Sequence, residues 1–326
     1  MSDPAQTGRW PRRLAAGLVL ALAGLNLVAW LHAGAMLSWA EGPARTAAPE
    51  QLGLAAKLRV LAAGVSVPRP RSVLTPIAYG LEYETHRIPN GRGDELDAWF
   101  IPGAGEEVVA LLFPGYASSK DSMLPHALAL LDLGAGVLLV DYYGVGDSSG
   151  TGTSLGILES GDVAAATAHA RATWPWAELV LYGRSMGGAA VLRAVALEGA
   201  APDAIVLESC FDRLLSTVGA RFHRMGLPAA PFAQLLVFWG GVRLGANGFE
   251  HDPVAFAASV TCPALVLQSA EDPNISHTQA RSIHGALGGW KRYSESSAAG
   301  HGQLLAAAPE RWRAEVTALL EQLGGW

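Results

Sequence analysis

The longest apolar run of the chain is Leu14–Leu37, in which Asn26 and His32 are the only conspicuously polar side chains. As a helix, this run covers about 36 Å, which is enough to cross the hydrocarbon core of a bilayer. Three arginines precede it and few charges follow closely. The positive-inside rule therefore predicts a cytoplasmic segment 1–13, a transmembrane anchor 14–37, and a main domain on the non-cytoplasmic side.

A cleaved signal peptide is an alternative interpretation of the same run, and a merely buried helix is another. Ser38 and Ala40 are small residues that could precede a cut at Glu41, after which the protein would be secreted. The run is longer than the roughly 7 to 15 apolar residues of a typical signal peptide, which favours a retained, single-pass anchor.

Residues 38–79 form a predicted juxtamembrane stalk. A short amphipathic helix is expected near Pro49–Ala63, and a proline-rich link follows through Pro68, Pro70 and Pro76. This pattern is typical of a spacer or of a surface helix close to a membrane.

The pattern becomes regular from residue 80 onward. GLEYETHRIPNG and ELDAWFIPG alternate like antiparallel strands, and VVALLF, VLLVD, ELVLYG, AIVLES and ALVLQS are continuous apolar strands. Helices are expected between and after them, at 154–173, 187–197 and 303–323. Strands that are apolar on both faces and separated by helices predict a doubly wound, mostly parallel α/β sheet over 80–326, with an antiparallel N-terminal edge.

The segment 211–260 contains no clear strand and predicts a small helical cap. It is rich in aromatic residues, namely Phe211, Phe222, Phe232, Phe238 and Trp239. Beside a membrane, such a cap favours a lipidic or aryl acyl chain as the ligand.

Charge excludes one class of partner. The net charge is −6 and only 16% of the residues are charged, with no basic run that contains interleaved aromatic residues. A nucleic acid is therefore not expected as a partner.

The motif G-x-S-x-G occurs at Ser185 in LYGRSMGGAA and at Ser148 in GDSSG. A nucleophile at this motif needs a strand that ends directly before it and a helix that begins at the serine, because that sharp turn exposes the hydroxyl. Ser185 has both, and Ser148 has neither. Ser185 is therefore the predicted nucleophile, and Ser148 is predicted to be a loop residue.

A serine nucleophile needs a base, and the base needs an orienting acid. In a sheet of this kind the order along the chain is serine, acid, histidine. His301 lies in the glycine-flanked loop SSAAGHGQLL after the last strand, and it is the predicted base. The other downstream histidines fall in predicted helices or in the cap: His223, His251, His277 and His284.

The acid is expected after the penultimate strand, in ALVLQSAEDPN. Asp272 is the predicted acid, with Glu271 next. Glu208, at the end of AIVLES, is a further alternative.

An oxyanion formed at the reacting carbonyl needs N–H donors that are already in place. The amide of Met186, which follows the nucleophile, is one predicted donor. The second is expected in the loop PGYASSK, where Gly115 permits an unusual turn and the amide of Tyr116 faces inward.

These segments carry a resemblance to a known family. LLFPGYASS, VLLVDYYGVGDSSG, LVLYGRSMGG, IVLESCF, CPALVLQSAEDPNIS and AAGHG, in this order, resemble the α/β-hydrolase superfamily over residues 80–323. They are most similar to its membrane-anchored depalmitoylase-like and serine-aminopeptidase-like branch. The resemblance implies a triad of Ser185, Asp272 and His301, and an oxyanion hole at Tyr116 and Met186. Pro114 stands where the family usually has histidine.

The residues and the resemblance together predict a serine acyl hydrolase, that is, an esterase, lipase-like enzyme or thioesterase. Its chemistry requires no metal and no organic cofactor, and its expected substrate is a small-molecule or lipidic ester. A serine peptidase of the aminopeptidase-like branch is an alternative, which acidic residues in the cap such as Glu250 and Asp252 would favour by binding a substrate amine. A catalytically silent binding protein is another.

Overall fold

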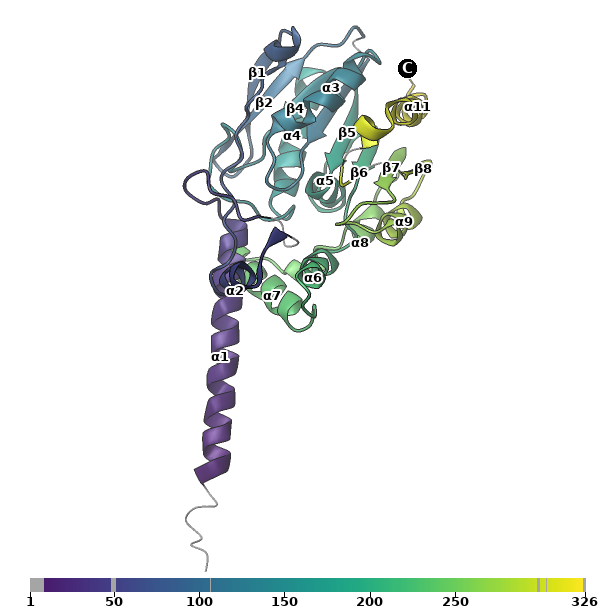
Figure 1. Cartoon of the computed structure of the whole chain (residues 1–326). Helices are drawn as coiled ribbons and strands as arrows, with labels where there is room; N and C mark the ends of the chain where they lie inside the picture. The colour runs from purple at the N-terminus through teal and green to yellow at the C-terminus, as the bar shows by residue number, and fades with distance from the viewer. Residues whose placement is uncertain (1–8, 48–50, 106, 298–299, 303, 325–326) are drawn as a thin grey trace, which may run out of the picture.

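The computed structural model describes residues 9–47, 51–105, 107–297, 300–302 and 304–324 (Figure 1). Eight strands within these ranges form one sheet in the order β1-β2-β4-β3-β5-β6-β7-β8. β2 pairs antiparallel with β1 and β4, and the other neighbours are parallel. The strands are β1 (Glu84–Pro89), β2 (Glu95–Ile101), β3 (Val108–Phe113), β4 (Gly136–Val140), β5 (Glu178–Arg184), β6 (Ala204–Glu208), β7 (Ala264–Ser269) and β8 (Lys291–Ser296). The predicted doubly wound, mostly parallel sheet with an antiparallel edge is confirmed.

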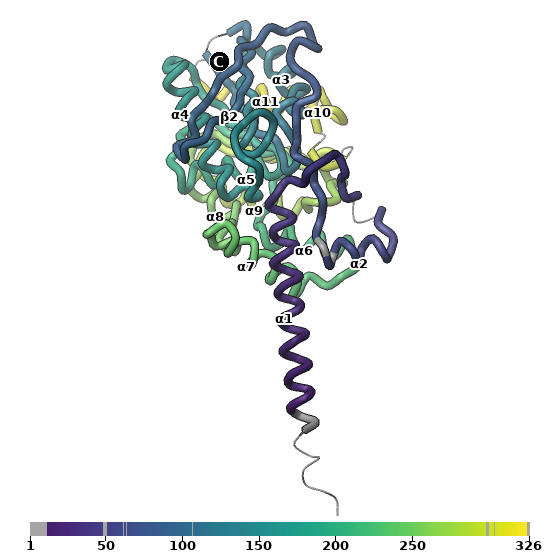
Figure 2. The backbone as a smooth tube through the Cα atoms, turned by 90° about the vertical axis from the view of Figure 1, so that its left-hand side faces the viewer, coloured from purple at the N-terminus to yellow at the C-terminus, as the bar shows by residue number. Residues whose placement is uncertain are grey.

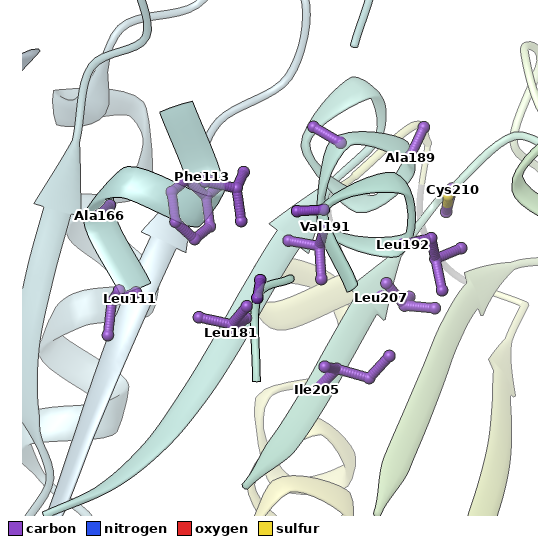
Figure 3. Packing of buried hydrophobic residues seen from close by; sticks show 14 of the residues in the cluster. Leu111, Phe113, Ala166, Leu181, Ala189, Val191, Leu192, Ile205, Leu207 and Cys210 are labelled. Carbon is purple, nitrogen blue, oxygen red and sulfur yellow. The ribbon is translucent and has the colours of Figure 1, made fainter. Parts of the chain in front are cut away.

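Helices cover both faces of this sheet, which is why its central strands are apolar throughout. Alternate residues of β3 point to opposite sides, so that Leu111 and Phe113 join one buried cluster and Ala110 and Leu112 join the other. Figure 3 shows the first cluster, where the helix after β5 packs over the central strands. The helices are α1 (Arg9–Leu37), α2 (Leu54–Ala63), α3 (Leu124–Leu131), α4 (Glu159–Thr173), α5 (Met186–Leu197), α6 (Leu214–Arg224), α7 (Phe232–Leu244), α8 (Pro253–Ala257), α9 (His277–Ala286), α10 (Leu304–Ala307) and α11 (Pro309–Leu320).

Helix boundaries differ from the predictions at polar or proline residues. α4 begins at Glu159 and not at residue 154, because the Glu159 carboxylate accepts hydrogen bonds from the loop amides of Ser154 (2.8 Å) and Gly156 (2.9 Å). The expected closing helix is divided into α10 and α11 at Pro309, since proline disfavours a helical conformation in the residue before it. Residues 49 and 303, where two helices were expected to begin, lie outside the described residues.

The N-terminal helix α1 extends away from the sheet, and only its C-terminal half contacts the rest of the protein (Figures 1 and 2). The Trp239 indole of α7 donates a hydrogen bond to the Asn26 side chain (3.1 Å), and the Arg243 guanidinium stacks 3.9 Å from the ring centroid of Trp30. The first half of α1 exposes Leu14, Leu18, Val19, Leu20 and Leu22. The residues Arg12–Leu37 are long and apolar enough to span a membrane.

A buried lysine holds the loop after β3 against the antiparallel edge. Lys120 is almost fully buried, and its ammonium group donates hydrogen bonds to the carboxylates of Asp97 on β2 and Asp141 after β4. The ammonium also lies 4.3 Å from the ring centroid of Trp99. Burial raises the pKa of Asp141, and the charge of Lys120 opposes that effect. The ion cluster therefore fixes a loop that begins at Pro114.

We expect the substitution Lys120→Met to destabilise the protein by about 3–5 kcal/mol, because it removes the cation beside the buried Asp141 and leaves Asp97 with only the half-exposed Arg87 among the described cations. Urea unfolding of the detergent-solubilised protein measures this loss. Lys291→Met is the matched control, since the bonds of Lys291 within the described residues go to backbone carbonyls. We expect it to change the free energy of unfolding by about 1 kcal/mol or less. Equal losses in both variants would contradict the role of the cluster.

Candidate active site

Ser185 stands between β5 and α5, at the N-cap of that helix. Its φ of 54° and ψ of −116° lie in a region that residues other than glycine rarely adopt, so the turn is strained. The Ser185 amide donates a hydrogen bond to the Glu208 carbonyl of the neighbouring strand (2.7 Å). The strained turn lifts the hydroxyl out of the strand and places it above the carboxyl edge of the sheet.

Glycine is required on both sides of Ser185, at positions 183 and 187, because other main-chain segments pass very close to them. A Cβ atom on Gly187 would lie 2.3 Å from the Phe113 carbonyl oxygen, and one on Gly183 would lie 2.5 Å from the backbone of Gly187. A side chain at either position would therefore displace main-chain atoms. The pattern G-x-S-x-G is therefore a steric requirement of the tight strand-to-helix turn at Ser185.

His301 connects the serine to a carboxylate. Its Nε2 lies 2.9 Å from Ser185 Oγ, and its Nδ1 lies 2.7 Å from Asp272 Oδ2. The second oxygen of Asp272 accepts hydrogen bonds from the amides of Asn274 (2.8 Å) and Ile275 (3.1 Å). The structure thus brings together the serine, histidine and aspartate that the sequence pattern selected.

The surroundings of Asp272 favour its ionised form. Burial of the side chain would by itself raise its pKa, but the hydrogen bond to His301 and the two backbone amides hold the pKa below its usual value. An ionised Asp272 accepts a hydrogen bond from Nδ1–H of the imidazole, so the proton stays on Nδ1. This leaves Nε2 unprotonated and able to accept the Ser185 hydroxyl proton.

Two amides lie beside Ser185 on converging segments. Met186 is the first residue of α5. The loop of Gly115 and Tyr116 packs closely against Ser185, because a Cβ on Gly115 would lie 3.3 Å from the Cβ of Ser185. Within the described part of the chain, the amides of Met186 and Tyr116 have no hydrogen-bond acceptor. Amides of this kind next to a nucleophile are able to bind a negatively charged oxygen.

Glu208 and Ser148 have structural partners. The Glu208 carboxylate accepts a hydrogen bond from the Tyr182 hydroxyl (2.6 Å), lies 2.9 Å from His126, and does not contact His301. Burial would raise the pKa of Glu208, but His126 and these hydrogen bonds lower it to about 2.

Ser148 Oγ bonds to the main chain of Asp97 and Asp141. The exposed Glu271 donates its amide to Ser269.

The remaining candidate histidines lie away from the serine. His277 and His284 belong to α9, and His223 belongs to α6. His251 is buried between the rings of Phe211 and Phe256. Over the residues that the structure describes, no group of three or more histidine, cysteine, aspartate or glutamate side chains could hold a metal ion.

Sequence reasoning missed the wall that the N-terminal region contributes to the site. The cleft above Ser185 has a volume of about 680 Å³, and Met36, Arg45, Val65 and Val67 line one side of it. The Tyr116 hydroxyl donates a hydrogen bond to the Met36 carbonyl at the end of α1 (3.1 Å). No catalytic motif marks these residues, because they act through their position and not through reactive groups.

Four arginines line the described part of this cleft, and no aspartate or glutamate does: Arg45, Arg184, Arg221 and Arg224. Glu250 and Asp252, the acidic pair considered for binding a substrate amine, lie elsewhere. Glu250 accepts a hydrogen bond from Asn247, whereas Asp252 pairs with Arg213 and caps α8. Neither carboxylate therefore lies among the described residues that line the cleft.

Comparison with known proteins identifies the relatives of this chain. Residues 106–225 match the family model described as serine aminopeptidase, S33. The uncharacterised Mycobacterium tuberculosis protein Rv2307c is 30% identical over 247 residues, which cover 72% of this chain and 76% of the relative. The uncharacterised Escherichia coli protein YfhR is 31% identical over 127 residues, which cover 36% of this chain and 44% of the relative.

Solved structures share the fold at lower identity. A Pyrococcus furiosus esterase superposes with a TM-score of 0.68 at 22% identity, over 79% of this chain and 98% of that one. An esterase from Exiguobacterium antarcticum gives a TM-score of 0.55 at 17% identity, over 73% of this chain and 100% of that one. With the family match and the sheet order, these findings show that the chain belongs to the α/β-hydrolase superfamily.

Proposed function

We propose that this protein is a serine acyl hydrolase that cleaves a carboxylic ester or thioester through an acyl-enzyme on Ser185. The observation that carries the proposal is the continuous chain of contacts from Ser185 Oγ through His301 to Asp272. It lies at a strained turn, beside two amides for which the described residues provide no acceptor. A hydrolase is also the class to which the matched family model belongs.

In the first half-reaction, Ser185 Oγ attacks the substrate carbonyl carbon while its proton moves to His301 Nε2. Asp272 stabilises the imidazolium that forms. The amides of Tyr116 and Met186 donate hydrogen bonds to the carbonyl oxygen as it becomes negatively charged. His301 then donates the proton to the leaving oxygen or sulfur, the bond to the leaving group breaks, and the acyl group remains on Ser185.

In the second half-reaction, His301 takes a proton from a water molecule, which attacks the acyl carbon. Collapse of the resulting tetrahedral intermediate releases the carboxylic acid and returns the proton to Ser185 Oγ. Every group that moves a proton in this cycle belongs to the chain itself.

The charges in the cleft favour an ester or thioester over a peptide with a free amine. An aminopeptidase needs a carboxylate near the scissile bond to bind the substrate's ammonium group. The described lining contains four arginines and no such carboxylate. The aminopeptidase alternative therefore has less support from this site.

We also propose that the anchor is retained and that the catalytic domain lies on the non-cytoplasmic side of the membrane. Met36 and Leu37 support the site through main-chain carbonyls, which accept hydrogen bonds from Tyr116 and from the Thr153 amide (3.0 Å). Cleavage before Glu41 would remove both contacts. The exposed leucines in the first half of α1 also favour a bilayer as their surroundings.

We expect the protein in membrane fractions to react covalently with a fluorophosphonate probe at its full-length mass, and Ser185→Ala to abolish the labelling. The variant lacks the hydroxyl that attacks phosphorus, and gel fluorescence measures the loss. Ser148→Ala is the matched control, because it alters another serine in the same type of motif and we expect its folded form to be labelled. Labelling of Ser185→Ala would contradict the assignment.

The substitution Asp272→Asn tests the assignment of Asp272 as the acid that orients His301. We expect it to lower kcat/KM for p-nitrophenyl butyrate by about 10³- to 10⁴-fold. An amide in place of the carboxylate no longer stabilises the imidazolium or selects the required tautomer of His301. We expect Glu271→Gln, which alters the neighbouring exposed acid, to retain the wild-type rate to within about twofold. The assignment is wrong if the two variants lose activity equally.

A further inference from the structure

An apolar cavity lies between the N-terminal helix and the cap. It has a volume of about 470 Å³ and is bounded by residues of α1, α2, α6, α7 and the loop between α6 and α7. Apart from His32, its lining consists of hydrophobic residues and one glycine, with Leu25, Val28, Phe222 and Leu235 among them. Its volume is within the roughly 300–1,000 Å³ typical of small-molecule sites.

The geometry of α1 places this cavity at the depth of the bilayer. The part of α1 from Leu14 to Leu25 precedes its hydrogen bond with α7 at Asn26, and as a helix it covers only about 18 Å. The hydrocarbon core is about 30 Å thick. To cross it, α1 must also use residues that pack against α7. The cavity, which Gly24 and Ala29 line, then lies within the leaflet adjacent to the catalytic domain.

The outer surface of the elements around the cavity agrees with this depth. Leu54 and Leu58 of α2, and Phe238 and Val242 of α7, are exposed apolar side chains. The loop that joins α6 to α7, with the sequence MGLPAAP over 225–231, contains no charged residue. Both views show α2 and α7 beside the same half of α1 (Figures 1 and 2). These side chains are suited to contact acyl chains of the surrounding lipid.

A thin layer of mostly apolar side chains separates the cavity from the catalytic cleft. Leu236 borders both the cavity and a smaller space of about 30 Å³ next to it. That smaller space shares Met36, Leu155, Leu214 and Val218 with the cleft above Ser185. Mostly apolar side chains therefore stand between the cavity and the cleft, and a hydrocarbon chain would reach the nucleophile by displacing them.

We propose that this cavity binds the hydrocarbon chain of the substrate, and that the substrate is a lipid ester or thioester that reaches Ser185 directly from the bilayer. This inference rests on the serine acyl hydrolase function proposed above. Here α1 is a wall of the substrate site as well as an anchor. Its apolar residues bind the acyl chain while the scissile carbonyl reaches the amides of Tyr116 and Met186.

Filling the cavity tests this inference. Gly24 and Gly17 are seven residues apart on the same face of α1, and a Cβ on either glycine meets no atom within 4 Å. Gly24 lines the cavity and Gly17 does not, so Gly24→Trp and Gly17→Trp are a matched pair. The full-length protein in phosphatidylcholine vesicles is assayed with p-nitrophenyl palmitate and p-nitrophenyl acetate.

We expect Gly24→Trp to lower kcat/KM for the palmitate ester by about tenfold or more, and to change the value for the acetate ester by less than about twofold. We expect Gly17→Trp to change neither value. An unaltered palmitate-to-acetate ratio in Gly24→Trp would overturn the chain-binding role. Absence of acetate hydrolysis and of fluorophosphonate labelling in the wild type would instead overturn the proposed function on which the inference rests.

A second measurement does not depend on a variant. An alkyl fluorophosphonate with a sixteen-carbon chain and a terminal diazirine reacts with the wild-type protein, and light then attaches the chain end to its neighbours. We expect cross-linked peptides from 24–32 of α1 and 232–236 of α7. Cross-links confined to the loops at the open side of the cleft would exclude the cavity as the chain site.

Discussion

The close contact between the turn at Ser185 and the end of β3 is the constraint on which the site depends. Gly187 passes so near the Phe113 carbonyl that no side chain fits between them. This contact brings the first turn of α5 against the loop that follows β3. One steric requirement therefore places the serine, the Met186 amide and the Tyr116 amide within the same small space. The positive φ of Ser185 is the conformational strain that accompanies this arrangement.

Buried polar groups hold the loops that the turn alone cannot position. Lys120 binds two carboxylates and fixes the segment that continues from Tyr116. On the other side, Glu208 accepts a hydrogen bond from the Leu304 amide (3.2 Å), and Ser209 accepts one from the Gly302 amide (3.1 Å). The loop of His301 is thus attached to the strand that also supports the Ser185 amide. The same contacts therefore stabilise the fold and hold two loops of the site in place.

The sequence was most informative where local chemistry decides the structure. The apolar strands predicted the parallel sheet. The strand before Ser185 and the helix after it distinguished this serine from Ser148, which has the same flanking glycines. Spacing along the chain also selected His301 and Asp272, which the structure joins by a hydrogen bond. The partners of Lys120 come from distant strands, and no local pattern marks them. The same holds for Met36 and Val65, which reach the cleft only through tertiary packing.

The N-terminal helix, the cap and the sheet contribute to one proposed site. In this site Ser185 Oγ is the nucleophile that forms a covalent bond to the acyl group. Intact-mass spectrometry of the protein, quenched in acid during turnover of a slowly hydrolysed ester, tests that claim most directly. The account predicts a mass increase of one acyl group, located by proteolysis on the peptide that contains Ser185. Turnover without a covalent acyl group, or an acyl group on another residue, would contradict it.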